Sequence, residues 1–181
     1  MASDRQECFT ATLLRPRSPE ASRWLFVLLP KPISASLPTR GATSVVCALQ
    51  GRELLTLALP DGQGGHWLKF SEDLVESARL TAGGRVELKV QPSATEAEAE
   101  IPQALRNALA ESPAAQSLWS AITPAARRDW IMWINSAKRA ETRAKRVQDT
   151  CQMLAGGKRR VCCFDRSGIY SKAFAAPTPA D

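Results

Sequence analysis

The apolar residues of this chain change their spacing once, and that change limits what the chain can fold into. Up to about residue 91 they alternate with polar residues or run in short blocks, as they do over 85–90. Beyond residue 100 they recur every three to four positions, as they do over 140–154. A period of two indicates strands, and a period near 3.6 indicates helices. The sequence therefore predicts an α+β protein with its strands first and its helices second.

The predicted strands are short, and turn residues separate them at intervals of about 8–12 residues. They cover residues 8–14, 24–29, 43–49, 53–59, 66–70 and 85–90. Gln50-Gly51-Arg52 joins two of them as a hairpin, and 71–80 has helical spacing with Ser71 as its N-cap. Many short strands with regular turns are typical of a barrel or a sandwich. We interpret residues 7–91 as a small closed antiparallel β-barrel.

The rest of the chain is predicted to form a linker, a helical domain and a tail. Residues 92–100 contain Pro92 and three glutamates and should bury little, so we expect a linker there. The helical C-terminal domain should span 101–165, where Ser112-Pro113 and Thr123-Pro124 mark helix starts and Gly156-Gly157 marks a helix end. Residues 166–181 are expected to be a flexible tail, because the last of them are small and include prolines.

Cysteine usage and the start of the chain suggest a reducing compartment. Five cysteines are present, an odd number at irregular spacing, and Cys162 and Cys163 are adjacent. A secreted disulfide framework normally has an even count in a shorter chain, so we expect reduced thiols. Residues 1–8 do not resemble a secretory signal, and the longest apolar run, 24–30, is far shorter than the roughly 20 residues of a membrane span. We expect a soluble, cytoplasmic protein without a membrane span.

No pattern in the sequence indicates a catalytic centre, a cofactor site or a metal site. His66 is the only histidine, no nucleophile elbow accompanies it, and we interpret it as a half-exposed strand residue beside Trp67. The glycine-rich loop 62–65 lacks the Lys-Ser/Thr pair of a phosphate loop. Adjacent cysteines on a strand would point to opposite faces, unlike the Cys-x2-Cys pairs of zinc sites. We therefore expect no enzymatic activity, no cofactor and no bound metal.

Positive charge is concentrated in the second half of the chain. Residues 1–100 hold 11 Lys and Arg against 12 Asp and Glu, whereas residues 101–181 hold 13 against 6. Arg139, Arg143 and Arg146, here called the arginine row, are four and three positions apart and so share one helix face beside an apolar stripe. An anionic partner should therefore prefer the second half.

Three interpretations of the arginine row remain open. It can be a solvated face, since helical surface ion pairs contribute only about 0.3–0.5 kcal/mol each. It can bind phosphate groups of a nucleic acid, a nucleotide or a lipid, although no aromatic residues are interleaved with it as single-stranded nucleic acid would favour. It can also pair with acidic groups of the barrel half, such as Glu72, Asp73 or Glu76.

Ligand binding can also involve residues outside the arginine row. Trp130 and Trp133 share a helix face, so a core role is favoured over an apolar groove for a peptide. The candidate ligand-binding residues are Arg139, Arg143, Arg146, Arg40 and Trp67.

Two stretches resemble known families. In the barrel half, Ser36-Leu37-Pro38-Thr39-Arg40-Gly41, Pro60-Asp61-Gly62 and His66-Trp67-Leu68 resemble a bacterial family of unknown function with a small closed barrel. In the helical half, the motif from Trp133 through Ala137-Lys138 to Glu141-Thr142-Arg143 is similar to the YdeI or OmpD-associated (OmdA) family, often labelled bacteriocin protection. The resemblance covers about residues 7–165. It implies tolerance of antimicrobial peptides and supplies no catalytic residues.

Two functional hypotheses follow from the residues and the resemblance. The first is a bacterial, non-enzymatic binding or stress-tolerance protein linked to protection from antimicrobial peptides, with an unknown anionic ligand or protein partner. The alternative is a nucleic-acid- or nucleotide-binding accessory protein that acts through the basic helical half. Salt distinguishes the two, because nucleic-acid binding weakens steeply as salt rises and apolar peptide binding does not.

Overall fold

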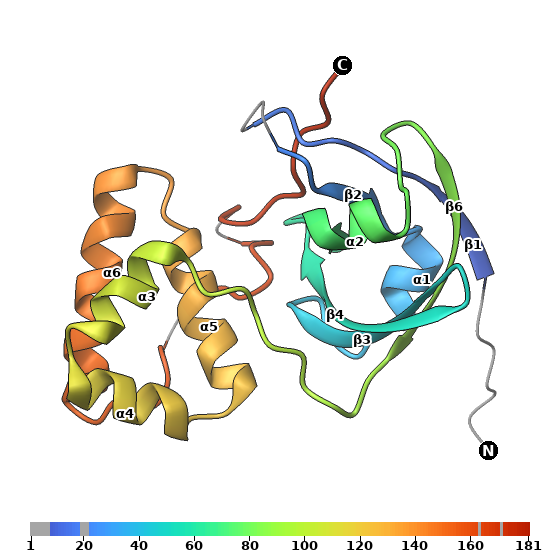
Figure 1. The fold of residues 1–181 in the computed structure, drawn as a ribbon. Helices are drawn as coiled ribbons and strands as arrows, with labels where there is room; N and C mark the ends of the chain where they lie inside the picture. The colour runs from blue at the N-terminus through green and yellow to red at the C-terminus, as the bar shows by residue number, and fades with distance from the viewer. Residues whose placement is uncertain (1–7, 19–21, 163, 171) are drawn as a thin grey trace. The chain divides into compact units, whose positions relative to one another are not determined.

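The chain folds into two compact units, drawn in Figure 1 from a computed structural model that describes residues 8–18, 22–162, 164–170 and 172–181. One unit consists of the described residues up to Thr95 together with Ser167–Asp181, and the other is Glu96–Arg166. The first unit is a nearly closed antiparallel barrel and the second is helical. The predicted α+β class, with a barrel followed by helices, is confirmed.

The described part of the barrel unit contains a six-stranded sheet in the order β1-β6-β3-β4-β5-β2, in which all neighbours are antiparallel. Its strands are β1 (Cys8–Thr12), β2 (Leu25–Leu28), β3 (Thr43–Leu49), β4 (Arg52–Pro60), β5 (His66–Phe70) and β6 (Arg85–Pro92). The two outer strands of this order meet at a single bridge between Leu14 and Phe26. Their backbones exchange two hydrogen bonds, from Leu14 N to Phe26 O (2.8 Å) and from Phe26 N to Leu14 O (2.9 Å). This exchange joins the two outer strands, so the barrel is nearly closed.

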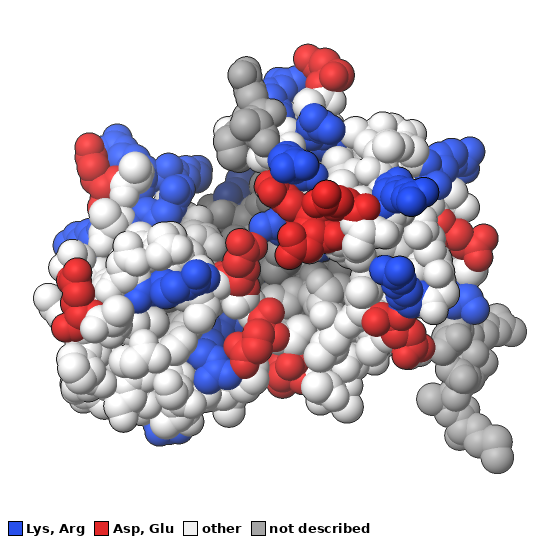
Figure 2. Space-filling model, viewed as in Figure 1, with Lys and Arg blue, Asp and Glu red and all other residues white. Residues whose placement is uncertain are grey.

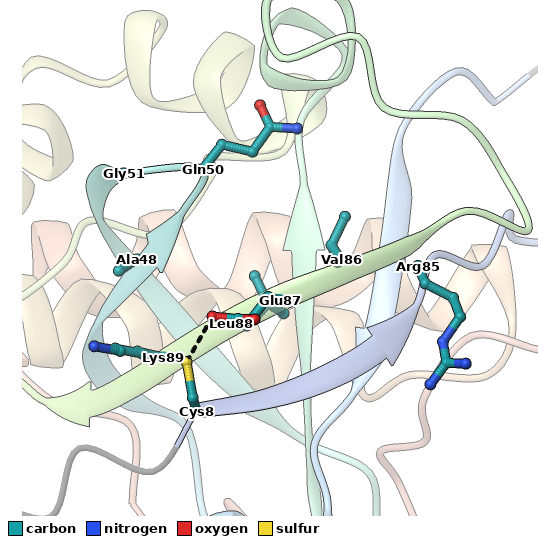
Figure 3. A pocket seen from close by; sticks show the side chains of 9 residues that line it. All are labelled: Cys8, Ala48, Gln50, Gly51, Arg85, Val86, Glu87, Leu88 and Lys89. Atoms are coloured by element: carbon teal, nitrogen blue, oxygen red, sulfur yellow. Dashed lines mark hydrogen bonds between the residues drawn. The ribbon is translucent and has the colours of Figure 1, made fainter.

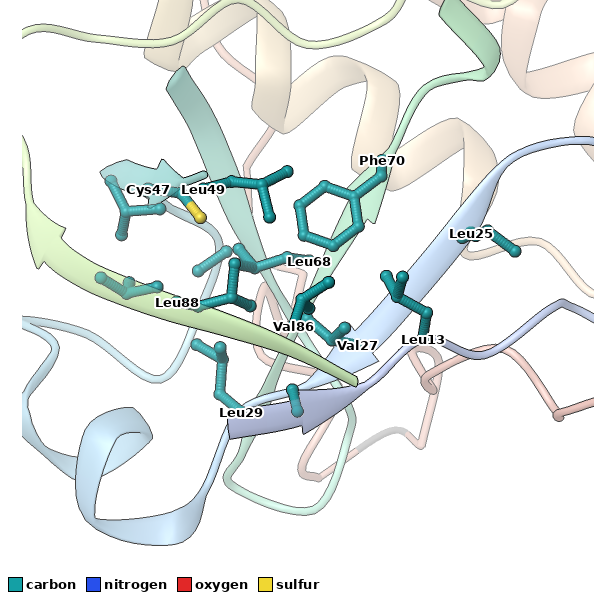
Figure 4. Packing of buried hydrophobic residues seen from close by; sticks show 14 of the residues in the cluster. Leu13, Leu25, Val27, Leu29, Cys47, Leu49, Leu68, Phe70, Val86 and Leu88 are labelled. Atoms are coloured by element: carbon teal, nitrogen blue, oxygen red, sulfur yellow. The ribbon is translucent and has the colours of Figure 1, made fainter. Parts of the chain in front are cut away.

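The barrel interior is filled by aliphatic side chains together with Phe70 and Cys47. Along β6, Val86, Leu88 and Val90 are buried and alternate with exposed residues, as the sequence pattern predicted. Figure 4 shows side chains from several strands pointing toward one another, among them Leu13, Leu49, Leu68 and Phe70. Alternate residues of each strand therefore form one core, and the remaining residues form the outer face of the barrel.

The hairpin between β3 and β4 lies where the sequence predicted it, and its loop is one residue shorter than expected. Leu49 pairs with Arg52, so only Gln50 and Gly51 form the loop. Both have positive φ, 50° and 76°, which is typical of the type I′ turn that fits the twist of a hairpin.

Two short helices pack against the two ends of β5. The helix α1 (Lys31–Ser36) contributes Ile33 to the barrel core. The helix α2 (Glu72–Ser77) begins where β5 ends. Ser71 caps it as predicted, because its hydroxyl accepts a hydrogen bond from Leu74 N (3.3 Å).

The C-terminal residues lie along the barrel unit. Arg17 N donates to Thr178 O and Ala180 N donates to Arg15 O, both at 2.8 Å, so the expected tail forms an antiparallel bridge. Gly62 (φ 74°) lies against the backbone of Phe174, and a Cβ at residue 62 would clash with that carbonyl. These contacts give the tail defined partners that its small, proline-containing sequence does not reveal.

The helical unit consists of α3 (Gln103–Ala110), α4 (Pro113–Ala121), α5 (Pro124–Asn135) and α6 (Ala140–Ala155). Its core includes Leu105, Trp119, Trp130, Ile134 and Leu154. The predicted caps are confirmed in part: the Thr123 hydroxyl accepts from Ala126 N (3.2 Å), whereas the Ser112 side chain forms no capping hydrogen bond.

The helical unit ends at the position that the sequence predicted. Gly156 is the C-cap of α6, and Gly157 follows it with positive φ. The described residues that follow directly, 158–162, contain no strand. Among the described residues, no helix has the length and hydropathy needed to cross a membrane.

Leu68→Ala should destabilise the barrel far more than Leu55→Ala. Leu68 is 0% exposed, so its loss leaves a cavity that should lower the free energy of unfolding by about 2–5 kcal/mol. Leu55 on β4 is 45% exposed, and its truncation should cost less than about 1 kcal/mol. Urea unfolding followed by tryptophan fluorescence measures both variants. Equal losses would contradict the packed interior.

Candidate functional site

The arginine row lies at the start of α6, and two of its members bind the end of α5. Arg139 is the N-cap residue of α6, and its side chain makes no capping hydrogen bond. Arg143 Nη2 donates to Ala137 O (3.1 Å). Arg146 Nη1 donates to Trp133 O and to Ser136 Oγ, the latter at 2.6 Å.

These contacts explain why arginine suits positions 143 and 146. The last carbonyls of a helix lack intrahelical partners, and cationic donors satisfy them while facing the negative end of the helix dipole. The Arg146 guanidinium also lies over the Trp133 ring, 5.0 Å from its centroid. Arg143 and Arg146 thus fasten α6 to the end of α5 inside the helical unit. The spacing predicted a shared face, but it could not predict these carbonyl partners.

The acidic groups considered as partners of the row lie on α2. There Glu72 Oε1 accepts from the backbone N–H of Arg23 (3.4 Å). Arg40 and Trp67, the other two candidate residues, also belong to the barrel unit. Arg40 is exposed in the loop after α1, and within the described residues its side chain forms no ion pair.

Trp67 belongs to an aromatic cluster on the outer face of the barrel. Its ring is stacked with that of Trp24 at 6.4 Å and meets that of Phe26 edge-on at 6.0 Å. In the sheet register, Leu59 and Leu28 flank Trp67 on the neighbouring strands. Trp24, Leu28, Leu59 and Trp67 are partly or fully exposed and are here called the outer aromatic patch. The sequence indicated Trp67 alone, because nothing in it shows that β2 lies beside β5.

His66 is buried, so its interpretation as a half-exposed residue was wrong. It is 1% exposed at the α1 end of β5. Its Nε2 lies 3.0 Å from Gly41 O, which can only accept, so Nε2 carries the proton. Nδ1 then accepts from the Ser34 hydroxyl at 2.5 Å. Both ring nitrogens are used to join α1 and its following loop to β5.

A shallow pocket of about 390 Å³ on the barrel is lined by residues of β1, β6 and the turn between β3 and β4 (Figure 3). Cys8 Sγ donates to Glu87 Oε1 at 3.0 Å, and Lys89 lies opposite Cys8 in the register. The hydrogen bond to Glu87 is the main reason why the pKa of the Cys8 thiol is raised. A raised pKa disfavours the thiolate, so Cys8 is a weak nucleophile although it is exposed.

The other thiols are placed as follows. Cys47 is buried in the barrel core, and burial raises its pKa to about 11. Cys151 is buried in the helical unit, Cys162 is exposed, and Cys163 lies outside the described residues. The four described cysteines form no disulfide. Among all residues that the structure describes, no three His, Cys, Asp or Glu side chains lie close enough together to bind a metal ion.

Three consecutive charged residues of α5 hold both ends of the helical unit. Arg127 and Arg128 form ion pairs with Glu98 and Glu96, which belong to the predicted linker; the Arg128 pair is 3.1 Å long. Asp129 forms an ion pair with Arg166 at 3.5 Å, on the side where the chain leaves the unit. Asp129 is 5% exposed, and burial raises the pKa of its carboxyl group despite the opposing charge of Arg166.

Arg146→Ala should destabilise the helical unit, whereas Arg139→Ala should not. The first change leaves the Trp133 carbonyl and the Ser136 hydroxyl without their cationic donor, and should cost about 1.5–3 kcal/mol. Arg139 makes no capping hydrogen bond, so its loss should change stability by less than about 0.5 kcal/mol. Thermal unfolding followed by circular dichroism compares the two. An unchanged melting temperature in Arg146→Ala would show that the contacts of Arg146 with Trp133 and Ser136 do not stabilise the unit.

Asp129→Asn should remove one contribution to the pH dependence of stability. The pKa of Asp129 is higher in the folded than in the unfolded protein. Its contribution to the free energy of unfolding is therefore most favourable below the unfolded pKa, and it is lost as pH rises through the folded pKa. Asparagine carries no such proton. The free energy of unfolding of the variant minus that of the parent should therefore increase as pH rises from about 4. Urea unfolding at several pH values measures this difference, and a constant difference would contradict the raised pKa.

Comparison with known proteins divides the chain at the same place as its structure. Residues 9–90, from β1 almost to the end of β6, match the family model of Domain of unknown function (DUF1905). Residues 98–157, which include α3 to α6, match the model described as Bacteriocin-protection, YdeI or OmpD-Associated (OmdA). A search of curated proteins gave no match. The resemblance inferred from the sequence is confirmed: the chain joins a barrel that matches DUF1905 to a helical unit that matches the YdeI or OmpD-associated family.

Proposed function

We propose that this chain is a non-enzymatic binding protein that contributes to protection from bacteriocins. The match of residues 98–157 to the bacteriocin-protection model supports the biological role. The observation that carries the non-enzymatic part is the position of His66. Its imidazole is buried and both nitrogens are hydrogen-bonded to Ser34 and Gly41, so the single histidine of the chain has no free position for proton transfer with a substrate.

The outer aromatic patch is the surface that best suits an amphipathic peptide. It presents two indole rings and two leucines from neighbouring strands, and Leu28 is 48% exposed. Tryptophans that are accessible on one side commonly dominate the affinity of peptide and protein interfaces. The barrel interior is filled by its own side chains, so a peptide would bind outside it. Trp130, by contrast, is 0% exposed and belongs to the helical core.

The alternative function, binding of nucleic acid or nucleotides through the basic half, rests on a different observation. Residues 101–181 carry 13 basic and 6 acidic residues. Much of this charge is engaged within the helical unit: Arg127, Arg128 and Arg166 are in ion pairs, while Arg143 and Arg146 bind carbonyls. Arg139 and Lys138 are exposed and remain available to an anion.

Titration with an amphipathic cationic antimicrobial peptide should distinguish the two functions. The peptide should raise the melting temperature, because a ligand of the folded state stabilises it, and should bind equally well at high salt. Trp67→Ala should weaken binding by at least about tenfold, while Leu55→Ala, a matched outer-face control, should not. Bacteria that produce the parent chain should survive the peptide better than those that produce Trp67→Ala.

Other outcomes would overturn the proposal. Salt-sensitive binding of duplex DNA or of a nucleotide, lost in a variant with both Lys138 and Arg139 changed to Ala, would favour the alternative. Peptide binding that is insensitive to Trp67→Ala would place the site elsewhere.

A further inference from the structure

A second surface pocket, of about 440 Å³, lies on the barrel unit beside α2. Three arginines from separate segments line it: Arg15 follows β1, Arg23 precedes β2 and Arg79 follows α2. Glu72 and Glu76 of α2 line the same pocket, together with the apolar Val75 and Leu80. None of these residues was singled out from the sequence as a ligand-binding group.

The backbone at the end of α2 fixes the position of Arg79. Leu80 N donates to Val75 O (2.8 Å) and Arg79 N donates to Glu76 O (3.1 Å), which is the hydrogen-bond pattern of a Schellman motif. Arg79 occupies the left-handed position of this motif with φ 52°, where glycine is usual. A side chain at this position is strained, and here it carries a guanidinium to the rim of a pocket.

The guanidinium groups of this pocket are not engaged within the described chain, unlike those of several other arginines. Arg127, Arg128, Arg143 and Arg146 bind carboxylates or carbonyls of their own unit, and Arg17 pairs with Asp181 at 3.0 Å. The structure, over the residues it describes, gives the guanidinium groups of Arg15, Arg23 and Arg79 no hydrogen bond or ion pair. The backbone N–H of Arg23 donates to Glu72 Oε1 (3.4 Å), and this contact holds the carboxylate at the pocket.

Charges of both signs therefore border one small pocket with an apolar lining. Figure 2 shows acidic side chains gathered over α2 with basic side chains beside them. Guanidinium groups present planar donor pairs that suit a carboxylate. Glu72 and Glu76 would repel further negative charge, which disfavours a polyanion such as nucleic acid. The same carboxylates can accept hydrogen bonds from an ammonium group.

We propose that this pocket binds a zwitterionic ligand of the amino-acid or short-peptide class. The ligand carboxylate lies among Arg15, Arg23 and Arg79, its ammonium group faces Glu72 and Glu76, and an apolar side chain rests on Val75 and Leu80. This pocket is lined by none of the residues of the outer aromatic patch, so it constitutes a second binding site.

The dipeptide leucyl-alanine, titrated by calorimetry into the full chain, tests the proposal. Binding is expected, and it should weaken at least about tenfold when the dipeptide is N-acetylated or C-amidated, since each change removes one charged end. Arg79→Gly is the key variant: it removes the guanidinium while placing the preferred residue at the left-handed position, so it should abolish binding without lowering the melting temperature. Glu76→Gln should weaken binding of the dipeptide but not of its N-acetylated form.

Matched controls separate this site from the proposed peptide surface. Arg52→Gln removes an exposed arginine at the start of β4 and should leave binding unchanged. Trp67→Ala should also leave dipeptide binding unchanged, so either proposal can fail without the other. The proposal is overturned if the parent chain does not bind the dipeptide, if inorganic phosphate binds as well as the dipeptide does, or if Arg79→Gly binds like the parent.

Discussion

The exchange of two backbone hydrogen bonds between Leu14 and Phe26 joins the outer strands of the sheet, and the barrel unit depends on it. Without this bridge, β1 and β2 would each present an open edge, which is a site for unwanted strand pairing. With it, the alternate residues of the strands face one closed interior. The outer face of the barrel, the helices α1 and α2 and the pocket beside α2 are all positioned by the strands that this bridge joins. Binding is therefore a property of the outside of this barrel, since its interior is occupied by its own side chains.

Local patterns in the sequence were sufficient to predict most elements but few of the contacts between them. The period of two predicted the strands, and Gln50-Gly51-Arg52 predicted the hairpin, because these features depend on neighbouring residues. Alternation along β5 places His66 on the same face as the buried Leu68, so its burial could have been predicted locally. Its partners, Ser34 and Gly41, could not, because they are 32 and 25 positions away. The bridges at Phe26 and Pro179 are equally non-local.

The candidate sites show the same limit: the sequence predicts which residues share a helix face, but not which groups that face contacts. Helical spacing placed Arg139, Arg143 and Arg146 on one face, but only the structure shows that Arg143 and Arg146 face the carbonyl end of α5. Conversely, Arg15, Arg23 and Arg79 have no common spacing, because they come from three segments that the barrel brings together. Two of the three arginines in the regular row proved to be engaged within their own unit, whereas the three arginines that line the pocket beside α2 share no sequence pattern.

The pairing of residues 15–17 with residues 178–180 has a consequence for how the chain is made. Arg17 and Asp181 are 164 positions apart, and the whole helical unit lies between them in the chain. Domains usually fold in the order of their synthesis, so β1 to β6 can close before the helical residues leave the ribosome. Residues 178–180 are translated after the helical unit, so they can dock onto strands that have already paired. Until these residues have been made, the strip beside Arg15 and Arg17 is open to solvent and to chaperones.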